Sequence, residues 1–439
     1  MNVLLITFSF PPVGGVGVLR ALSLAKYLPS EGIRVDVLTA RNAPAVGRDQ
    51  ALLKQVPSDV TIHRTWTLDL PFSLRKGIKK LLTRGRAPAS SSALAPAGRP
   101  GLMSRLQGLI ANLLLPDPQI GWLPFAYPAA RHIIRSRKID AVIITVPPFS
   151  SVKLAARLRK AFPALPIVLD FRDEWLTTTL ELVSFNSNER ARRIARQTES
   201  EAVNAATAVV AVTRNAADEL RKRYPHQPAT KFLTVPNGYD DTPSPRPHTE
   251  PQRVDKVTLT YMGSVYGTTD PRTLLEAVAR LPADVRDRLR IRFIGHVETP
   301  AYRQALAALA PTVELVGFLP MSEAHRQLAA SHYALLITQD PINVSAKFYD
   351  YLGAGKPIIA AVHPEGEVRR LLDETGAGEW ASIHDPAALR QLLIKAVNRV
   401  TPEGLVPYRP RSEAVAAYHR KPLTRRYASL LQSFSQERV

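Results

Sequence analysis

A lysine and an aspartate, three residues apart, lie in a stretch that ends in glycine and proline. Lys347 and Asp350 follow Ser345 and Ala346, where we expect a helix to begin. The free N–H groups and the dipole of a helix start favour an anion, and Lys347 adds a positive charge that suits a diphosphate. Asp350, one turn later, can accept hydrogen bonds from both hydroxyls of a ribose. These four residues are therefore candidates for binding a nucleotide, and the alternative is a solvated helix face.

Charged residues follow a short apolar strand in the first half of the chain. The strand is expected over Ile167–Phe171, and Asp170, Arg172 and Asp173 lie at its carboxyl end. Open α/β sheets bind ligands at such ends. Asp173 could accept a hydrogen bond from a substrate hydroxyl or act as a base, and Arg172 could orient it or bind a phosphate. We interpret Arg172 and Asp173 as candidate catalytic residues; the alternative is an Arg–Asp pair that only fixes the loop.

Three glycines lie between the first expected strand, Val3–Phe8, and the helix that follows it. They are Gly14, Gly15 and Gly17. Glycine permits positive φ and lets the backbone approach a ligand closely, so this loop is a candidate for contact with an acceptor or a phosphate. Arg20, one turn into the helix, could bind that phosphate. The alternatives are a simple tight turn and a surface arginine.

A second glycine loop follows the expected strand Val257–Met262. Gly263 and the N–H groups after it, beginning at Ser264, can cradle a phosphate. Arg272, near the start of the next helix, could supply positive charge. These three residues extend the candidate donor site. His296 follows a later strand near the expected nucleotide-base pocket, and an ordinary loop histidine is the alternative.

These residues need elements that carry them to the edges of sheets. Short apolar strands alternate with helices along residues 1–241, and the same alternation restarts over residues 257–407. Such alternation predicts buried parallel sheets. Residues 242–256 are expected to be a linker, and residues 408–439 form a basic helix. The predicted fold class is α/β, with two doubly wound Rossmann-like domains facing a cleft and a C-terminal helix crossing back.

Residues 70–116 form an insertion without a single acidic residue. Its middle is rich in alanine, proline, serine and glycine, and amphipathic stretches flank it. The cations of the first stretch are Arg75, Lys76, Lys79, Lys80, Arg84 and Arg86. This pattern predicts an insertion that lies on an anionic bilayer. The alternative is a solvated loop between two ordinary helices.

Composition narrows the class of protein. The 439 residues are 45% hydrophobic and 22% charged, which excludes a disordered or fibrous chain. With 58 basic and 38 acidic residues the net charge is +20, so phosphorylated small molecules, anionic membranes and nucleic acid are the candidate partners. No nucleic-acid-binding motif is present, and nucleic acid ranks last. The absence of cysteine excludes disulfides and a cysteine nucleophile.

Neither a signal peptide nor a long apolar run is recognisable in the sequence. We therefore expect a cytoplasmic protein that, where it meets a membrane, lies on its surface. No Asp-x-Asp motif occurs near a strand end, and no two histidines stand at i and i+4. We therefore expect neither a metal nor a cofactor.

Six blocks, in this order along the chain, resemble those of the GT-B glycosyltransferases of family 4, and of bacterial surface-polysaccharide members in particular. They are Thr7–Arg20, Pro116–Trp122, Asp170–Trp175, Pro236–Asp240, Gly317–Pro320 and Lys347–Pro357. The resemblance implies a retaining transfer of a sugar from a nucleotide sugar, bound by the C-terminal domain. The implied acceptor is a glycan or polyprenyl-diphosphate-linked glycan held by the N-terminal domain. It also implies cell-surface or exopolysaccharide synthesis at the inner face of the cell membrane.

Several positions depart from the family pattern. Arg172 stands where many members have a histidine that contacts the donor hexose. Ser264 and Asp270 replace the arginine and lysine of a diphosphate clamp. Ile342 replaces the first glutamate of a Glu-x7-Glu pair, for which Asp340 could substitute. These departures favour an alternative: a catalytically inactive GT-B-like protein that binds sugar nucleotides or serves as a scaffold.

Overall fold

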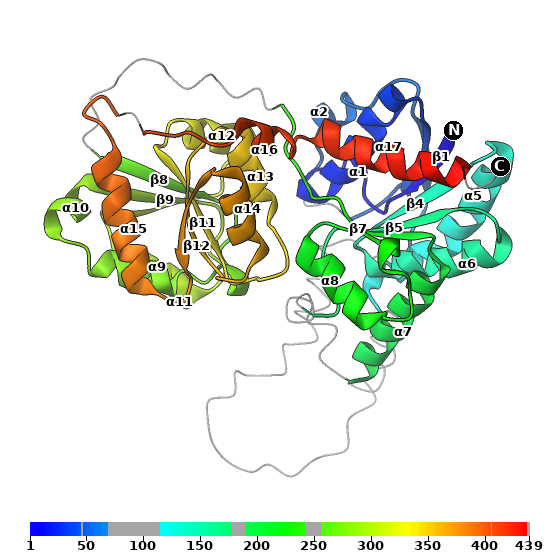
Figure 1. The fold of residues 1–439 in the computed structure, drawn as a ribbon, viewed down its shortest axis with the longest axis horizontal. Coiled ribbons are helices and arrows are strands. Elements are labelled where there is room, and N and C mark those ends of the chain that lie inside the picture. The colour runs from blue at the N-terminus through cyan, green and yellow to red at the C-terminus, as the bar shows by residue number, and fades with distance from the viewer. Residues whose placement is uncertain (45–46, 69–114, 178–188, 242–255, 405, 437–439) are drawn as a thin grey trace, which may run out of the picture. The chain divides into compact units, whose positions relative to one another are not determined.

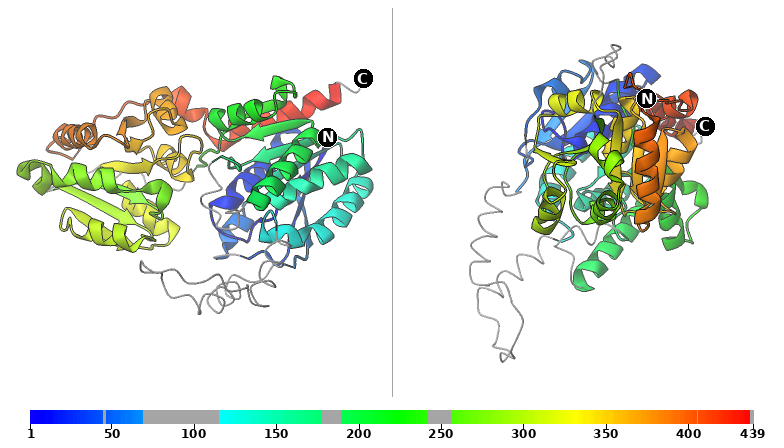
Figure 2. Two further views of the ribbon diagram at one scale, coloured as in Figure 1. Left: turned by 90° about the horizontal axis from the view of Figure 1, so that it is seen from below. Right: turned by 90° about the vertical axis from the view of Figure 1, so that its left-hand side faces the viewer.

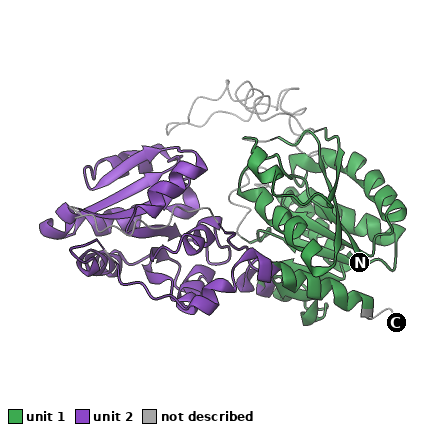
Figure 3. Cartoon of the chain, turned by 90° about the horizontal axis from the view of Figure 1, so that it is seen from above, with its two compact units in different colours: residues 1–211, 219–234, 424–439 green, residues 212–218, 235–423 purple. Residues whose placement is uncertain are grey.

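The computed structural model describes residues 1–44, 47–68, 115–177, 189–241, 256–404 and 406–436. The chain forms two compact units (Figure 3). Unit 1 consists of residues 1–211, 219–234 and 424–439, and unit 2 of residues 212–218 and 235–423. The predicted membrane-binding cations, from Arg75 to Arg86, lie outside the described residues, as does nearly all of the insertion.

Within the described residues, unit 1 contains a seven-stranded sheet (Figure 1). Its strands are parallel, in the order β3-β2-β1-β4-β5-β6-β7. The strands are β1 (Asn2–Ile6), β2 (Arg34–Ala40), β3 (Thr61–Thr65), β4 (Ala141–Val146), β5 (Ile167–Phe171), β6 (Ala208–Ala211) and β7 (Phe232–Thr234). The helices are α1 (Leu19–Tyr27), α2 (Gln50–Leu53), α5 (Leu123–Ser136), α6 (Lys153–Ala161), α7 (Glu189–Ala205), α8 (Arg214–Arg223) and α17 (Arg420–Gln436). Helix α8 begins in residues of unit 2 and ends in unit 1, and α17 likewise.

Unit 2 repeats this design with six described strands, also parallel, in the order β10-β9-β8-β11-β12-β13. The strands are β8 (Val257–Met262), β9 (Leu289–Ile294), β10 (Val313–Gly317), β11 (Tyr333–Thr338), β12 (Ile358–Val362) and β13 (Gly378–Ser382). The helices are α9 (Arg272–Ala279), α10 (Ala283–Arg288), α11 (Pro300–Ala307), α12 (Met321–Ala329), α13 (Ala346–Gly353), α14 (Glu367–Thr375), α15 (Pro386–Arg399) and α16 (Ser412–Ala416).

The central strands are buried on both faces, as parallel strands between helix layers must be. Every residue of β4 and of β11 is buried. In unit 2 the side chains alternate along each strand between two apolar clusters. Helices cover both faces of this sheet (Figure 2). Tyr261 and Phe293 pack on the side of α9, α10 and α15, whereas Met262 and Ile294 pack on the side of α12, α13 and α14.

Each sheet has one place where the order of strands along the chain reverses. In unit 1 this switch point lies between β1 and β4, and in unit 2 between β8 and β11. Loops that leave the carboxyl ends of the two strands at a switch point diverge to opposite faces, which opens a crevice for a ligand. The loop with Gly14, Gly15 and Gly17 follows β1, and Gly263 follows β8. Both predicted glycine loops therefore stand at switch points.

The last helix returns the chain to unit 1. Residues 424–436 of α17, red in Figure 1, belong to that unit. Tyr427 and Leu431 are buried, and Arg425 forms an ion pair with Glu31 at 3.0 Å. Among the described helices, none combines the length and apolar character needed to cross a membrane.

Candidate functional site

In unit 2, Lys347 joins the start of α13 to the end of β8. Its Nζ donates a hydrogen bond to the hydroxyl of Tyr261 at 2.6 Å and lies 4.5 Å from the centre of that ring. The aliphatic part of the side chain crosses Gly263 so closely that a Cβ added there would lie 2.4 Å from the lysine Cε. Because Gly263 also has φ = +109°, it is a position where the fold requires glycine.

Ser345, Ala346 and Ser264 of the predicted donor site are linked to this lysine by the chain or by Tyr261. Ser345 is the exposed N-cap residue of α13 and Ala346 is its first helical residue. The backbone oxygen of Ser264 accepts a hydrogen bond from the Tyr261 hydroxyl at 2.9 Å. A chain of hydrogen bonds thus runs from Lys347 through Tyr261 to the loop that follows Gly263.

The electrostatics of this group suit an incoming anion. Burial lowers the pKa of Lys347 to about 8, and the charge of Asp350 only partly opposes that effect. Burial raises the pKa of Asp350, against the charges of His325, Arg420 and Lys347. Because burial removes water from the Lys347 ammonium group, a phosphate oxygen placed next to it would stabilise the charged form.

Arg272 is bound by a residue of its own loop. Its Nε donates to the Asp270 carboxylate at 2.6 Å, and its backbone N–H donates to the same group at 3.0 Å. Asp270 is only 3% exposed, and the hydrogen bonds from Arg272 lower its pKa despite burial. Asp270, which stands in the place of the clamp lysine, therefore neutralises Arg272, the residue that could have supplied positive charge.

Neither Ile342, which replaces the first glutamate of the Glu-x7-Glu pair, nor Asp340 is directed to a ligand by its contacts in this structure. The Asp340 carboxylate accepts hydrogen bonds from the backbone N–H groups of Ile342 and Asn343 at 2.8 and 2.9 Å. It also accepts one from the Asn343 side chain at 3.0 Å. Ile342 is 7% exposed and belongs to the core. Asp340 thus holds its own turn together. After β9 and β10, His296 stacks on Phe318 with ring centres 5.5 Å apart, and both are exposed.

In unit 1, Arg172 holds the glycine loop. Its guanidinium donates to the backbone oxygens of Gly17, Val146 and Pro147, with 3.2 Å between Nε and the Val146 oxygen. Burial lowers the pKa of this arginine, and the charge of Asp173 partly offsets the effect. The guanidinium therefore connects the loop after β1 with the end of β4, across the switch point. In the same loop, Gly15 has φ = +95°, and the Gly14 N–H donates to the Gly47 oxygen at 3.0 Å.

Arg20 is a buried residue and not a surface arginine. Its Nη2 forms an ion pair with Asp170 at 2.8 Å and donates to the Tyr427 hydroxyl at 2.6 Å. The Tyr427 hydroxyl in turn donates to Asp170 at 2.6 Å. Arg20, Asp170 and Tyr427 are 9%, 0% and 2% exposed, so this buried triad joins α1, β5 and α17.

Asp173, in contrast to these groups, is exposed. It follows β5 directly after Arg172. The structure thus brings Gly17 and Arg172 together in unit 1, and Gly263, Ser264 and Lys347 together in unit 2. Tyr261 and Tyr427 are the functional neighbours that sequence reasoning missed. Tyr261 reads as one more apolar residue of a strand, and Tyr427 lies 257 residues from its partner Asp170.

Comparison with known proteins identifies the family. The family model described as "Glycosyl transferase 4-like domain" matches residues 14–238. The D-inositol 3-phosphate glycosyltransferase of Geodermatophilus obscurus is 30% identical over 205 residues, which cover 41% of this chain and 45% of that protein. The chain therefore matches less than half the length of this curated relative.

Solved structures extend the likeness to the whole chain. HepE of Anabaena, in complex with UDP and glucose, has a TM-score of 0.62 at 15% identity and covers 99% of this chain and 100% of its own. The α,α-trehalose-phosphate synthase of Burkholderia xenovorans has a TM-score of 0.63 at 11% identity, with coverage of 98% and 100%.

Two doubly wound units and these neighbours define the class of protein: the fold is GT-B, which confirms the predicted fold class. The chain belongs to the family of glycosyl transferase 4-like proteins, as its sequence blocks implied.

Proposed function

We propose that this protein transfers a sugar from a nucleotide-sugar donor to a hydroxyl of an acceptor. The observation that carries the proposal is Lys347, whose side chain crosses the Gly263 backbone at the switch point of unit 2. A lysine, a helix start and a glycine loop together make a site for a diphosphate. Family membership and the nucleotide complex of HepE support the same reading.

In this mechanism the diphosphate is the leaving group. Lys347 and the first N–H groups of α13 stabilise the negative charge that builds on it, and no metal or cofactor takes part. Asp350 accepts hydrogen bonds from the ribose hydroxyls. The exposed His296 and Phe318 offer aromatic faces for the base. Arg272 contributes little charge because Asp270 binds it.

The acceptor binds to unit 1 in this proposal. Asp173, exposed at the end of β5, accepts a hydrogen bond from the acceptor hydroxyl. Arg172 acts as a positioning residue, because it fixes the glycine loop through Gly17. The transfer proceeds with retention, as the family resemblance implies.

The cellular role is proposed on charge and resemblance. A net charge of +20 favours an anionic bilayer, where a lipid-linked glycan acceptor would lie. We propose a peripheral protein of the inner face of the cell membrane that acts in cell-surface or exopolysaccharide synthesis. Its contact with the membrane would run through the cations from Arg75 to Arg86, which lie outside the described residues.

A panel of nucleotide sugars tests this function. The purified protein is incubated with each donor, with and without bacterial membrane lipids, and released nucleoside diphosphate is measured. We expect one donor to turn over faster with lipid, and the Lys347→Ala and Asp350→Ala variants to lose that turnover. The anomeric configuration of the product, read by proton NMR, decides between retention and inversion.

A second candidate function is a GT-B protein that binds a sugar nucleotide without transferring the sugar. The buried Ile342 and the engagement of Asp340 in its own turn favour it, because neither residue offers a free carboxylate to the donor sugar. Binding of a nucleotide sugar by the wild type, with no release of diphosphate from any donor and acceptor combination, would favour this alternative.

A further inference from the structure

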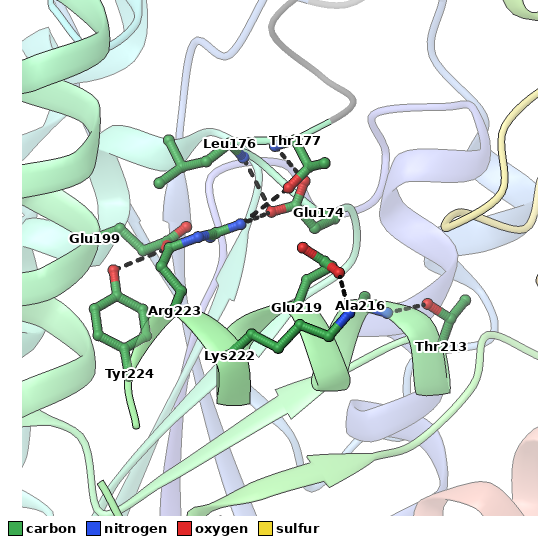
Figure 4. A network of polar contacts seen from close by, with 10 residues as sticks. All are labelled: Glu174, Leu176, Thr177, Glu199, Thr213, Ala216, Glu219, Lys222, Arg223 and Tyr224. Carbon is green, nitrogen blue, oxygen red and sulfur yellow. Dashed lines mark hydrogen bonds and ion pairs between the residues drawn. The ribbon is translucent and has the colours of Figure 1, made fainter. Parts of the chain in front are cut away.

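A cluster of hydrogen-bonded polar side chains fixes the loop after β5 to α7 and α8 (Figure 4). Arg223 lies between two carboxylates, 2.6 Å from Glu174 and 2.5 Å from Glu199. The Tyr224 hydroxyl donates to Glu199 at 2.9 Å. Glu174 also accepts the backbone N–H of Thr177 at 2.6 Å. Both glutamate side chains are 1% exposed, so this cluster is buried on its acidic side.

A cavity of about 660 Å³ lies beside this cluster. That volume is in the range of pockets that bind small molecules. The lining contains three cations, three hydroxyls, one carboxylate and one leucine: Arg196, Lys222, Arg223, Thr177, Ser200, Tyr224, Glu219 and Leu176. Arg223 is paired with Glu174 and Glu199, so the cations that can turn to a ligand are the exposed ones of the lining.

The two cations that a ligand can recruit are Arg196 and Lys222. Arg223 already faces two buried carboxylates, whereas Arg196 is exposed on α7 and Lys222 is exposed on α8. Lys222 forms an ion pair with Glu219 at 2.9 Å, but its side chain is 73% exposed. An exposed pair of this kind adds about 1 kcal/mol at most, so an anion can compete for the lysine.

Further charge on α7 strengthens the preference for an anion. Arg192 and Arg193 precede Arg196 by one helical turn and are exposed. Basic residues gathered on one helix raise the local concentration of anions around that helix. Ser200, one turn after Arg196, adds a hydroxyl that can bind a phosphate or a carboxylate.

We propose that this cavity binds an acidic group, either a phosphate or a carboxylate, of the sugar acceptor. The assignment to the acceptor rests on the proposed function. Asp173 and Thr177 leave the same end of β5, and four residues of chain separate their Cα atoms by at most about 14 Å. The acceptor hydroxyl at Asp173 and the acidic group in the cavity then belong to one molecule. The substrate class that follows is a phosphorylated or uronic-acid-containing glycan.

Binding of simple sugars to the full chain tests the proposal without a donor. The probes are D-glucose 6-phosphate, D-glucuronate and neutral D-glucose, and calorimetry measures their affinities. The cavity variant is Arg196→Gln/Lys222→Gln. The control variant, Arg34→Gln/Lys160→Gln, removes the same charge from exposed sites that do not line the cavity. Thermal melting verifies that both variants fold.

We expect at least one acidic sugar to bind the wild type and the control equally, and the cavity variant at least about tenfold more weakly. The stronger of the two acidic probes identifies the group as phosphate or carboxylate. Equal binding by both variants, or no preference over glucose, would overturn the proposal. So would a cavity variant that loses only its affinity for vesicles of anionic phospholipid, because the cations would then serve a membrane. A failed donor assay leaves this sugar-binding result unaffected.

Discussion

Lys347 combines two properties that rarely occur together on a surface lysine. It donates a hydrogen bond to Tyr261, and it lies against the Gly263 backbone. The same burial that lowers its pKa to about 8 makes its charge more effective towards a diphosphate, since the site holds less water to screen that charge. At the scale of single residues, this lysine is the group on which the proposed chemistry depends most.

The first prediction concerns this lysine and pH. Lys347 is charged below its pKa of about 8 and neutral above it, so donor kcat/KM should fall as pH rises through about 8. A bound diphosphate raises that pKa, so the fall in kcat should lie at higher pH. Lys347→Arg should remove the fall, and Lys347→Ala should lower kcat about 10²–10³-fold. A wild-type profile that stays flat from pH 7 to 9.5 would contradict this role.

Asp173 gives a second prediction at the same scale. Asp173→Asn removes the proposed hydrogen-bond acceptor for the substrate hydroxyl, and transfer should fall about 10²–10⁴-fold. Nucleotide affinity should not change, because the residue belongs to unit 1. The matched control is Asp59→Asn, which changes another exposed aspartate. A variant of Asp173 with wild-type transfer rates would remove this residue from the mechanism.

The sequence predicts the positions of these residues better than their partners. Lys347, Gly263 and Arg172 were found because strand ends, helix starts and glycine loops leave local patterns. The pairing of Arg20 with Asp170 and Tyr427 has no such local pattern in the sequence. Arg20 lies 150 positions from Asp170 and 407 positions from Tyr427. The sequence predicts that Arg172 faces a substrate or Asp173, and it does not predict the hydrogen bonds that its guanidinium donates to three backbone oxygens.

At the scale of elements, buried polar groups fasten the glycine loop and its helix from two sides. Arg172 binds the loop itself at Gly17, and the buried triad of Arg20, Asp170 and Tyr427 anchors α1 to β5 and α17. A charge buried as deeply as Asp170 is tolerated only when it is fully paired. The C-terminal helix is therefore part of the structure that positions the candidate acceptor loop.

The triad supplies a third prediction. Tyr427→Phe removes a hydroxyl that bonds both Arg20 and Asp170, and it should lower the free energy of unfolding of unit 1 by about 1–3 kcal/mol. Tyr127→Phe is the control, because that hydroxyl is exposed and its contact with the Arg157 oxygen is 3.5 Å long. Denaturant unfolding followed by fluorescence measures both. Equal stabilities would show that the triad adds nothing to folding.

The close approach of the Lys347 side chain to the Gly263 backbone supplies a fourth prediction. Gly263→Ala places a Cβ 2.4 Å from Lys347 at a residue with positive φ, so the lysine must move away from the loop. Nucleotide affinity should drop at least about tenfold. Gly267→Ala is the control, because its Cβ would meet nothing within 4 Å. If both variants bind nucleotide like the wild type, the close approach of lysine and glycine has no part in binding.

At the scale of the whole molecule, the chain uses one design twice. Each unit is a parallel sheet with a glycine loop at its switch point. This repetition was predictable because alternating strands and helices leave a regular pattern of apolar residues. The detailed contents of the two sites were less predictable. Asp270 and Asp340, for example, bind neighbours within their own loops, and neither contact follows from residue type alone.

Binding of nucleoside diphosphates by calorimetry tests the central claim most directly. The wild type, Lys347→Ala and the exposed-lysine control Lys160→Ala are each titrated with UDP, GDP, ADP and CDP at pH 7, where Lys347 is charged. We predict that one nucleotide binds the wild type and the control equally, and binds Lys347→Ala at least about tenfold more weakly. Equal affinity for all three proteins, or no binding to the wild type, would contradict the account.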